Sequence, residues 1–252
     1  MPPRPVIRSD GNAPVEALWP TLAQRGLVGV LRAVAEGERL ARAGTPMVEV
    51  FVPVDAIVTI ARQTRHDPVP LIVALIGYEG IVGGPVLLGA PCWQHDAIVA
   101  RPGQVVAVRA DTLLGLFGSD EPTRTLCLRV IHNHSLQLAQ SVVANLGHSV
   151  ERRVARWLLM IHDRMPGDTV ALTHDWLGAL LNVRRATVTD ALHMLEGQRL
   201  LRCSRGQITI RDRAGLEQAA GQSYGFSEND YRDAIGPFGK SSAAEPDQAE
   251  RP

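Results

Sequence analysis

Two adjacent arginines, Arg184 and Arg185, stand where a helical apolar pattern begins in the stretch LNVRRATVTDALHMLEG. Arginine presents a planar fork of N–H donors that suits the two acceptors of guanine and the oxygens of phosphate. Positive charge at a helix N-terminus opposes the helix dipole by about 0.3–1 kcal/mol. We therefore expect the pair to bind an anion. The competing interpretation leaves both side chains solvated or paired with an acid such as Asp190.

The surrounding residues, 172–212, predict two helices, a tight turn and a hairpin. Thr173 suits the N-cap of the first helix, and Asn182 tolerates the positive φ of a tight turn. The second helix is expected over about 185–198, and its apolar residues should pack inward: Val188, Ala191, Leu192 and Leu195. A turn at Gly206 joins two short strands. A helix-turn-helix followed by such a wing places the start of its second helix in the major groove of DNA.

The charge distribution supports this interpretation. The whole chain has 26 basic and 26 acidic residues, but residues 147–213 hold 11 basic against 7 acidic ones, a net of +4. Residues from 214 onward hold 3 against 7, a net of −4. Local positive charge is typical of a module that binds a polyanion. The last segment, 216–252, loses its periodicity and ends in small and charged residues, which predicts a disordered tail.

Upstream of the arginine pair, the sequence predicts a β domain and then a long helix. Residues 26–112 contain short apolar runs such as MVEVFVPV and LIVALIG between Gly and Pro turns, which favours an all-β sandwich or barrel. Residues 119–146 read as one helix, with Ser119 or Asp120 as its cap. Four apolar residues of this helix recur at coiled-coil spacing: Leu128, Ile131, Leu138 and Val142. Ser135 and Asn145 fall at the same spacing.

This spacing predicts a helix that pairs with a second copy of the chain, and the alternative is an amphipathic helix lying on its own domain. No run of eighteen apolar residues and no signal-peptide core occur, so we expect no membrane span and no secretion. The three cysteines, Cys92, Cys127 and Cys203, stand far apart, which favours inert thiols in a reducing cytoplasm.

Catalytic and metal-binding patterns are weak in this sequence. His95 with Asp96, beside Cys92, could ligate a metal or haem, but a surface or core histidine is the preferred interpretation. No nucleophile elbow, Walker motif or HExxH motif occurs. We therefore expect no enzyme, no metal and no cofactor. Two alternatives stay open: a metal-dependent or small-molecule-binding jelly-roll protein, and a degenerate sensor-domain protein that acts through protein–protein contact.

The stretches RRVARWLLMIHDRM, LTHDWLGALLNVRRATVTDALHMLEGQRLL and RGQITIRDR resemble the Crp/Fnr family of bacterial transcription regulators. The resemblance covers about residues 20–215. It implies an α+β fold with an N-terminal β-roll of the jelly-roll type, a long dimerisation helix and a C-terminal winged helix-turn-helix. The expected parts are a cyclic-nucleotide-binding-like sensor domain at 1–118, the dimerisation helix at 119–146, the DNA-binding domain at 147–215 and the tail at 216–252.

The resemblance also implies roles for individual residues of this chain. Arg185 fills the position that typically reads a base, and Arg205 falls at the wing tip, a usual phosphate contact. The full set expected at the DNA comprises Thr173, His174, Arg184, Arg185, Thr187, Thr189, His193 and Arg205. The implied partners are double-stranded DNA, a second copy of the chain and RNA polymerase.

The departures from the family's pattern concern the effector and the target sequence. Family members that bind cyclic AMP carry a Gly-Glu pair followed about ten residues later by Arg-Ser. Here the corresponding elements are Gly77-Tyr78-Glu79 and His95-Asp96, so the phosphate-binding arginine is missing and Asp96 would repel phosphate. Cyclic AMP is therefore not expected to bind, and the effector stays unknown. The clustered N-terminal cysteines of an Fnr-type iron–sulfur sensor are also missing. Ala186 replaces an acidic base-contacting residue, so the target sequence cannot be borrowed from other members.

Overall fold

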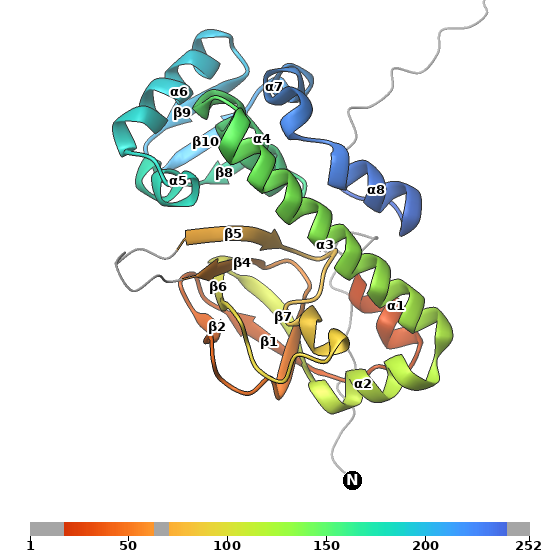
Figure 1. Cartoon of the computed structure of the whole chain (residues 1–252). Coiled ribbons are helices and arrows are strands. Elements are labelled where there is room, and N and C mark those ends of the chain that lie inside the picture. Colours follow the sequence, from red (N-terminus) through yellow and green to blue (C-terminus); the bar gives the residue numbers. More distant parts are fainter. Residues whose placement is uncertain (1–17, 63–70, 241–252) are drawn as a thin grey trace, which may run out of the picture.

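The computed structural model describes residues 18–62 and 71–240, which form a β-roll, a long helix and a smaller C-terminal domain (Figure 1). The expected α+β fold class is confirmed. The first part contains α1 (Leu18–Gln24), β1 (Val30–Val34), β2 (Arg39–Ala41), β3 (Glu49–Pro53), β4 (Ile57–Arg62), β5 (Leu71–Ile76), the 3-10 helix η1 (Gly84–Leu88), β6 (Asp96–Arg101), β7 (Gly103–Arg109) and α2 (Ala110–Ser119). The second part contains α3 (Glu121–Gly147), α4 (Val150–His162), β8 (Thr169–Ala171), α5 (His174–Leu181), α6 (Arg185–Gly197), β9 (Leu201–Ser204), β10 (Gln207–Ile210), α7 (Arg213–Ala220), the 3-10 helix η2 (Gly221–Ser223) and α8 (Phe226–Ala234).

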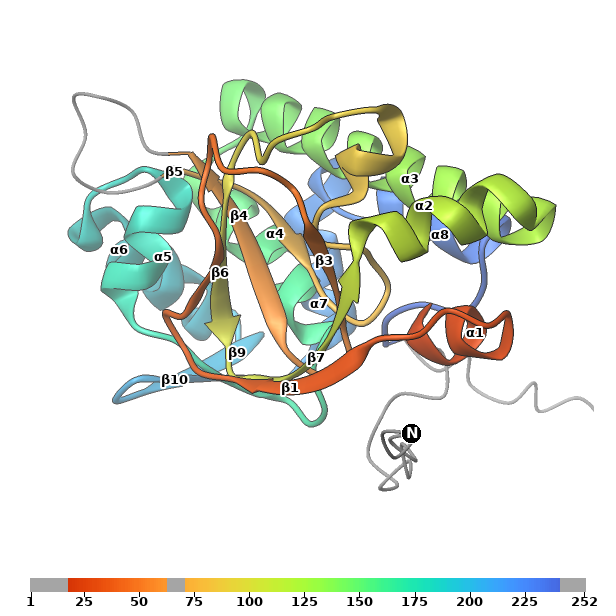
Figure 2. The same ribbon diagram turned by 90° about the horizontal axis from the view of Figure 1, so that it is seen from below.

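The β-roll consists of two antiparallel sheets, in the orders β1-β7-β3 and β2-β6-β4-β5 (Figure 2). Its strands are rich in Val and Ile, whose branched side chains pack well on a pleated surface. Val50, Val58 and Val106 are fully buried in the core of this domain. The β-roll thus forms its own hydrophobic core, against which α3 packs through Cys127 and Val130.

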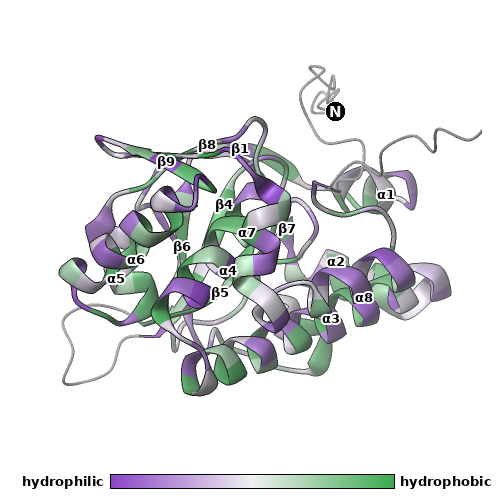
Figure 3. Ribbon diagram, turned by 90° about the horizontal axis from the view of Figure 1, so that it is seen from above, coloured by the Kyte–Doolittle hydropathy of each residue, from purple (hydrophilic) through white to green (hydrophobic). Residues whose placement is uncertain are grey.

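Helix α3 begins at Glu121, because the Asp120 side chain accepts a hydrogen bond from the Thr123 N–H at 2.9 Å. The helix therefore starts two residues after the expected residue 119. The buried residues of α3 share one face, on which Cys127 and Val130 pack against the β-roll and polar side chains such as Asn133 and Gln137 follow further along the helix. Another face leaves Leu138 and Val142 exposed to 40% and 57%. Figure 3 shows this mixture of apolar and polar residues around the helix. A single helix thus offers one buried face of mixed polarity and one exposed apolar face.

The C-terminal domain packs α4, α5 and α6 on the small sheet β8-β10-β9. Ile57 and Leu75 of the β-roll join the hydrophobic core of this domain, so the two domains are in contact. Strand β5 lies at the edge of its sheet, and the Leu75 N–H donates to Gln137 Oε1 of α3 at 3.1 Å. Helix α5 also lies against β5. Within the described ranges, no helix combines the length and apolar content needed to cross a bilayer.

The expectation of a disordered tail at 216–252 is wrong for residues 216–240. This segment contains the end of α7, the turn η2 and helix α8, which lies along α3 (Figure 1). The segment orders because it contacts the rest of the chain through buried residues, among them Tyr231 and Phe238. Residues 241–252 lie outside the described residues, as do residues 1–17 of the expected sensor domain.

Candidate nucleic-acid interface

The turn between α5 and α6 is built from local sequence signals. Thr173 caps α5, because its Oγ1 accepts a hydrogen bond from the Trp176 N–H at 3.1 Å. Asn182 ends the helix in the left-handed conformation, with φ 51° and ψ 49°. Gly178 lets the two helices approach, since a Cβ at this position would lie 3.0 Å from the Val183 carbonyl oxygen. These three residues fix the angle at which α6 leaves the turn.

Helix α6 buries one face in the domain core and presents the other to solvent. The buried residues are the four that the apolar spacing predicted, Val188, Ala191, Leu192 and Leu195. Arg184 is the N-cap residue and Arg185 the first residue of the helix, and both are exposed. The first turn carries no acidic side chain, so nothing within it offsets the two positive charges.

Arg185 has one acidic neighbour, but it differs from the expected candidate. Its Nη1 lies 3.4 Å from Asp175 Oδ2 of α5, and both side chains are about two-thirds exposed. The expected partner was Asp190, and helical spacing alone does not predict Asp175, because a contact between the starts of two helices depends on the turn geometry. An exposed ion pair of this kind contributes only about 0–1 kcal/mol, so Arg185 can leave it for another anion.

The other residues expected on α5 and α6 divide into two groups. Thr187 and His193 are exposed on α6. His174 and Thr189 are half-buried and bind each other, with Nδ1 and Oγ1 2.9 Å apart, while the Thr189 hydroxyl donates to the Arg185 carbonyl at 3.1 Å. We therefore interpret His174 and Thr189 as a link between the two helices that positions Arg185.

The wing has three strands, one more than the sequence predicted. Strand β10 pairs with β9 and also with β8, which precedes α5. Arg205 and Gly206 form the exposed turn between β9 and β10, where Gly206 has φ 71°. The Cys203 N–H donates to Glu196 Oε1 at 2.9 Å and ties the wing to the end of α6. Burial, and secondarily Glu196, raises the pKa of the Cys203 thiol to about 11, which keeps it protonated.

The four residues expected at the dimer contact lie on the side of α3 that faces away from the buried polar row. Leu128, Leu138 and Val142 are exposed to between 40% and 57%, and Ile131 is half-buried. Leu146, at the end of the helix, is 85% exposed. The single chain thus leaves an apolar strip along α3 in contact with solvent.

The two positions that correspond to the cyclic-nucleotide motif are occupied by contacts within the chain. Glu79 is buried and pairs with Arg164, whose Nη2 lies 2.8 Å from Glu79 Oε1. The buried Asp96 accepts a hydrogen bond from the Ala43 N–H at 2.8 Å and lies 3.5 Å from Arg39 Nη1. Among the residues that the structure describes, no three His, Cys, Asp or Glu side chains are placed to hold a metal ion.

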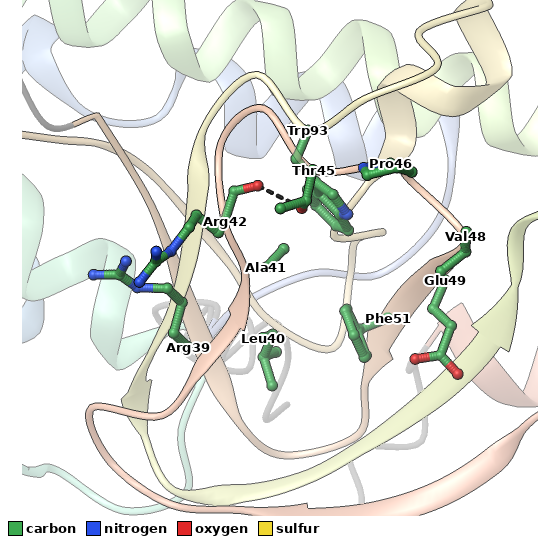
Figure 4. A pocket seen from close by; sticks show the side chains of 10 residues that line it. All are labelled: Arg39, Leu40, Ala41, Arg42, Thr45, Pro46, Val48, Glu49, Phe51 and Trp93. Atoms are coloured by element: carbon green, nitrogen blue, oxygen red, sulfur yellow. Dashed lines mark hydrogen bonds between the residues drawn. The ribbon is translucent and has the colours of Figure 1, made fainter.

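Two cavities lie near these positions. One, of about 380 Å³, opens on the β-roll beside the stacked rings of Phe51 and Trp93, with Arg39 and Arg42 on one side and Glu49 on the other (Figure 4). The other, of about 370 Å³, lies between the β-roll and α3 and has a mainly apolar wall that also includes Gln94, His95 and Ser135. The imidazole of His134 forms part of that wall, and burial lowers its pKa to about 4. The second cavity therefore offers a mainly apolar environment in which His134 is neutral at pH 7.

Comparison with known proteins agrees with this geometry. Residues 152–219 match the model of the Crp-like helix-turn-helix domain. The fold is similar to FixK2 from Bradyrhizobium japonicum, with a TM-score of 0.67, 20% identity, and coverage of 77% of this chain and 98% of the other. It is also similar to a CRP-family transcriptional regulator from Thermus thermophilus, with a TM-score of 0.62, 15% identity, and coverage of 75% and 96%.

A third similar structure is the c-di-GMP-responsive global regulator CLP of Xanthomonas campestris, with a TM-score of 0.61, 16% identity, and coverage of 76% and 98%. The comparison with curated proteins found no match. Residues 152–219 thus form a Crp-like helix-turn-helix domain, and the chain has the fold of the Crp/Fnr transcription regulators.

Proposed function

We propose that this protein is a homodimeric transcription regulator that binds double-stranded DNA through the exposed start of α6. The observation that carries the proposal is the position of Arg184 and Arg185 at the free N-terminus of this helix, inside a Crp-like helix-turn-helix domain. In such domains the second helix enters the major groove with its N-terminal residues against the bases. Arg185 would read a base. Contacts to bases or phosphates would come from four further residues: Arg184, Thr187, His193 and the wing residue Arg205. Thr173 would contact the DNA backbone, and His174 and Thr189 would position helix α6.

The apolar strip on α3 supports a dimer of two parallel subunits. Exposed Leu128, Leu138 and Val142 recur at the spacing of a coiled-coil seam, with the half-buried Ile131 between them. Dimer symmetry would place two α6 helices about 34 Å apart, so the target would be a near-palindrome with half-sites one helical turn apart. RNA polymerase is the natural further partner of such a regulator, and the cytoplasm is its natural compartment. We expect no catalytic activity.

Selection of duplexes from a random pool by the purified protein tests the proposal. We expect enrichment of sites with two-fold symmetry and a centre-to-centre spacing of about 10–10.5 base pairs. Fluorescence anisotropy on a selected site should give a slope of log K against log salt near −7, if each subunit contacts roughly four phosphates. A protein that binds no duplex even at low salt, or a selected pool without symmetry, would contradict the proposal.

A further inference from the structure

An ion pair between the two domains is buried in the protein interior. Arg164, which follows α4, donates from Nε to Glu79 Oε1 at 2.9 Å, and each side chain is only 2–3% exposed. Glu79 lies in the turn after β5 of the β-roll, while Arg164 belongs to the C-terminal domain. Arg164 also donates to the Met160 carbonyl at 2.7 Å. A Cβ on Gly77 would lie within 3.0 Å of both side chains, so this turn fits closely around the pair. Separating the domains would take each of these two charges away from its opposite charge, which is costly in a buried site.

The segment 221–240, which we name the C-terminal strap, closes over this ion pair. The ring of Phe238 lies 5.0 Å from the Arg164 guanidinium carbon, and its centroid is 6.0 Å from that of Tyr78 and 5.1 Å from that of Tyr231. The Tyr231 hydroxyl donates to the Glu79 carbonyl at 3.1 Å. Phe238 is only 4% exposed, so its ring is buried and shields the ion pair from solvent.

The two ends of the strap meet at Asp163, the residue before Arg164. The Tyr224 hydroxyl donates to Asp163 Oδ2 at 2.5 Å, and the Lys240 N–H donates to Asp163 Oδ1 at 3.2 Å. Arg213 of α7 also donates to the same carboxylate at 2.7 Å. The Tyr78 hydroxyl, on the β-roll, donates to the Asp163 carbonyl at 3.1 Å. The strap is therefore anchored at the junction of the two domains.

Between its ends the strap holds α3. Asn133 Nδ2 donates to the Ser227 carbonyl at 2.6 Å and to Asp230 Oδ2 at 3.0 Å, while Arg129 Nη1 donates to the Ala234 carbonyl at 2.7 Å. Figure 1 shows α8 running alongside the middle of α3. One segment thus contacts the β-roll, the long helix and the C-terminal domain.

We propose that the C-terminal strap and Arg164 form an internal lock that holds the DNA-binding domain in the orientation that binds DNA, so that no small molecule has to impose it. The proposal rests on the DNA-binding function proposed above. The buried carboxylate of Glu79 is already bound by Arg164, a side chain of the DNA-binding domain itself. A chain that supplies this contact internally keeps the competent orientation populated, whereas a chain without it would divide its population among several orientations.

Phe238→Ala tests the lock, with Phe226→Ala as the matched control. Both residues lie in the strap, but Phe226 is 59% exposed and Phe238 is 4% exposed. If unlocking reduces the competent fraction to about one third in each subunit, the dimer should lose roughly tenfold in affinity for its selected duplex. The salt slope should stay the same because the phosphate contacts are unchanged. Phe226→Ala should bind like the wild type.

The outcomes separate failure of the lock from failure of the proposed function. If neither the wild type nor either variant binds any duplex, the DNA-binding function is refuted. If the wild type binds DNA and the Phe238 and Phe226 variants bind it with equal affinity, the lock is refuted. Tighter binding by Phe238→Ala would also refute the lock, since the strap would then be inhibitory. Circular dichroism checks that each variant is folded. If Phe238→Ala is not folded, Phe238→Leu, which keeps an apolar side chain but loses the ring over Arg164, should still lose roughly threefold.

Discussion

Replacing Arg185 by alanine should weaken DNA binding without weakening the fold. In the free protein this side chain contributes little to stability, because its pair with Asp175 is exposed on both sides and is worth about 0–1 kcal/mol. The same charge opposes the dipole of α6, whose first turn has no acidic residue, by about 0.3–1 kcal/mol. The two effects have opposite signs. We therefore expect the free energy of unfolding to change by less than about 0.5 kcal/mol.

The effect on the complex should be much larger. An arginine that reads a base contributes about 1–3 kcal/mol, and a symmetric dimer loses two of them. The expected loss is about 2–6 kcal/mol, or roughly 30-fold to 3 × 10⁴-fold in the dissociation constant. The loss should be greatest on the selected duplex and small on duplexes substituted at one position of each half-site, because that is the base pair Arg185 reads.

Fluorescence anisotropy on the selected duplex and its single-position substitutions measures this, with thermal unfolding in parallel. Arg32→Ala is the control, since Arg32 is an exposed arginine of the β-roll, with 42% of its side chain accessible. Unchanged affinity of the Arg185 variant would refute the placement of α6 in the groove. An equal loss of affinity on every duplex would show that Arg185 contacts the DNA backbone and does not read a base.

Three further outcomes are expected. Leu138→Glu places a charge in the apolar strip of α3 and should shift the protein from dimer to monomer in sedimentation, whereas Thr125→Glu, at another exposed position of the helix, should not. Arg205→Ala should weaken binding about equally on all duplexes and reduce the salt slope by about 1 per subunit. The pKa of His134 is lowered to about 4 by burial, so the unfolded chain takes up its proton first, and stability falls as the pH drops from about 6.5 to 4. The free energy of unfolding should fall by about 3 kcal/mol over this range because of His134, and this contribution should be absent in His134→Leu. Chemical denaturation at several pH values measures it, and equal profiles of unfolding free energy against pH for the two proteins would contradict it.

Much of the winged domain could be predicted because its signals are local. Thr173 and Asn182 act through their own turn, and the four buried residues of α6 follow from helical spacing alone. The left-handed φ of Asn182 is a property of one residue and its neighbours. For the same reason the start of α3 was placed to within two residues by its cap, Asp120.

The strap could not be predicted because its stability comes from distant partners. Glu79 and Arg164 are 85 positions apart in the sequence, and Asn133 and Ser227 are 94 positions apart, so no local pattern predicts either contact. The sequence of α8 is polar and short, and such a segment orders only when tertiary contacts offset its loss of conformational entropy. The loss of periodicity and the small and charged residues after 216 predicted a disordered tail, but Glu228 is buried there and caps α8 by accepting from the Gly225 N–H.

The edge strand β5 has a consequence for how the protein behaves in a crowded solution. An open sheet edge is a template on which another chain can add a strand, and this is a common start of aggregation. Here the Leu75 N–H is bound by Gln137, and α5 lies against the strand. Any movement that swings the winged domain away would remove α5 from this edge and leave it covered by α3 alone. Variants whose domains move freely should therefore aggregate more readily than the wild type. An increase in turbidity as the protein is concentrated would report this opening of the domains before any DNA is added.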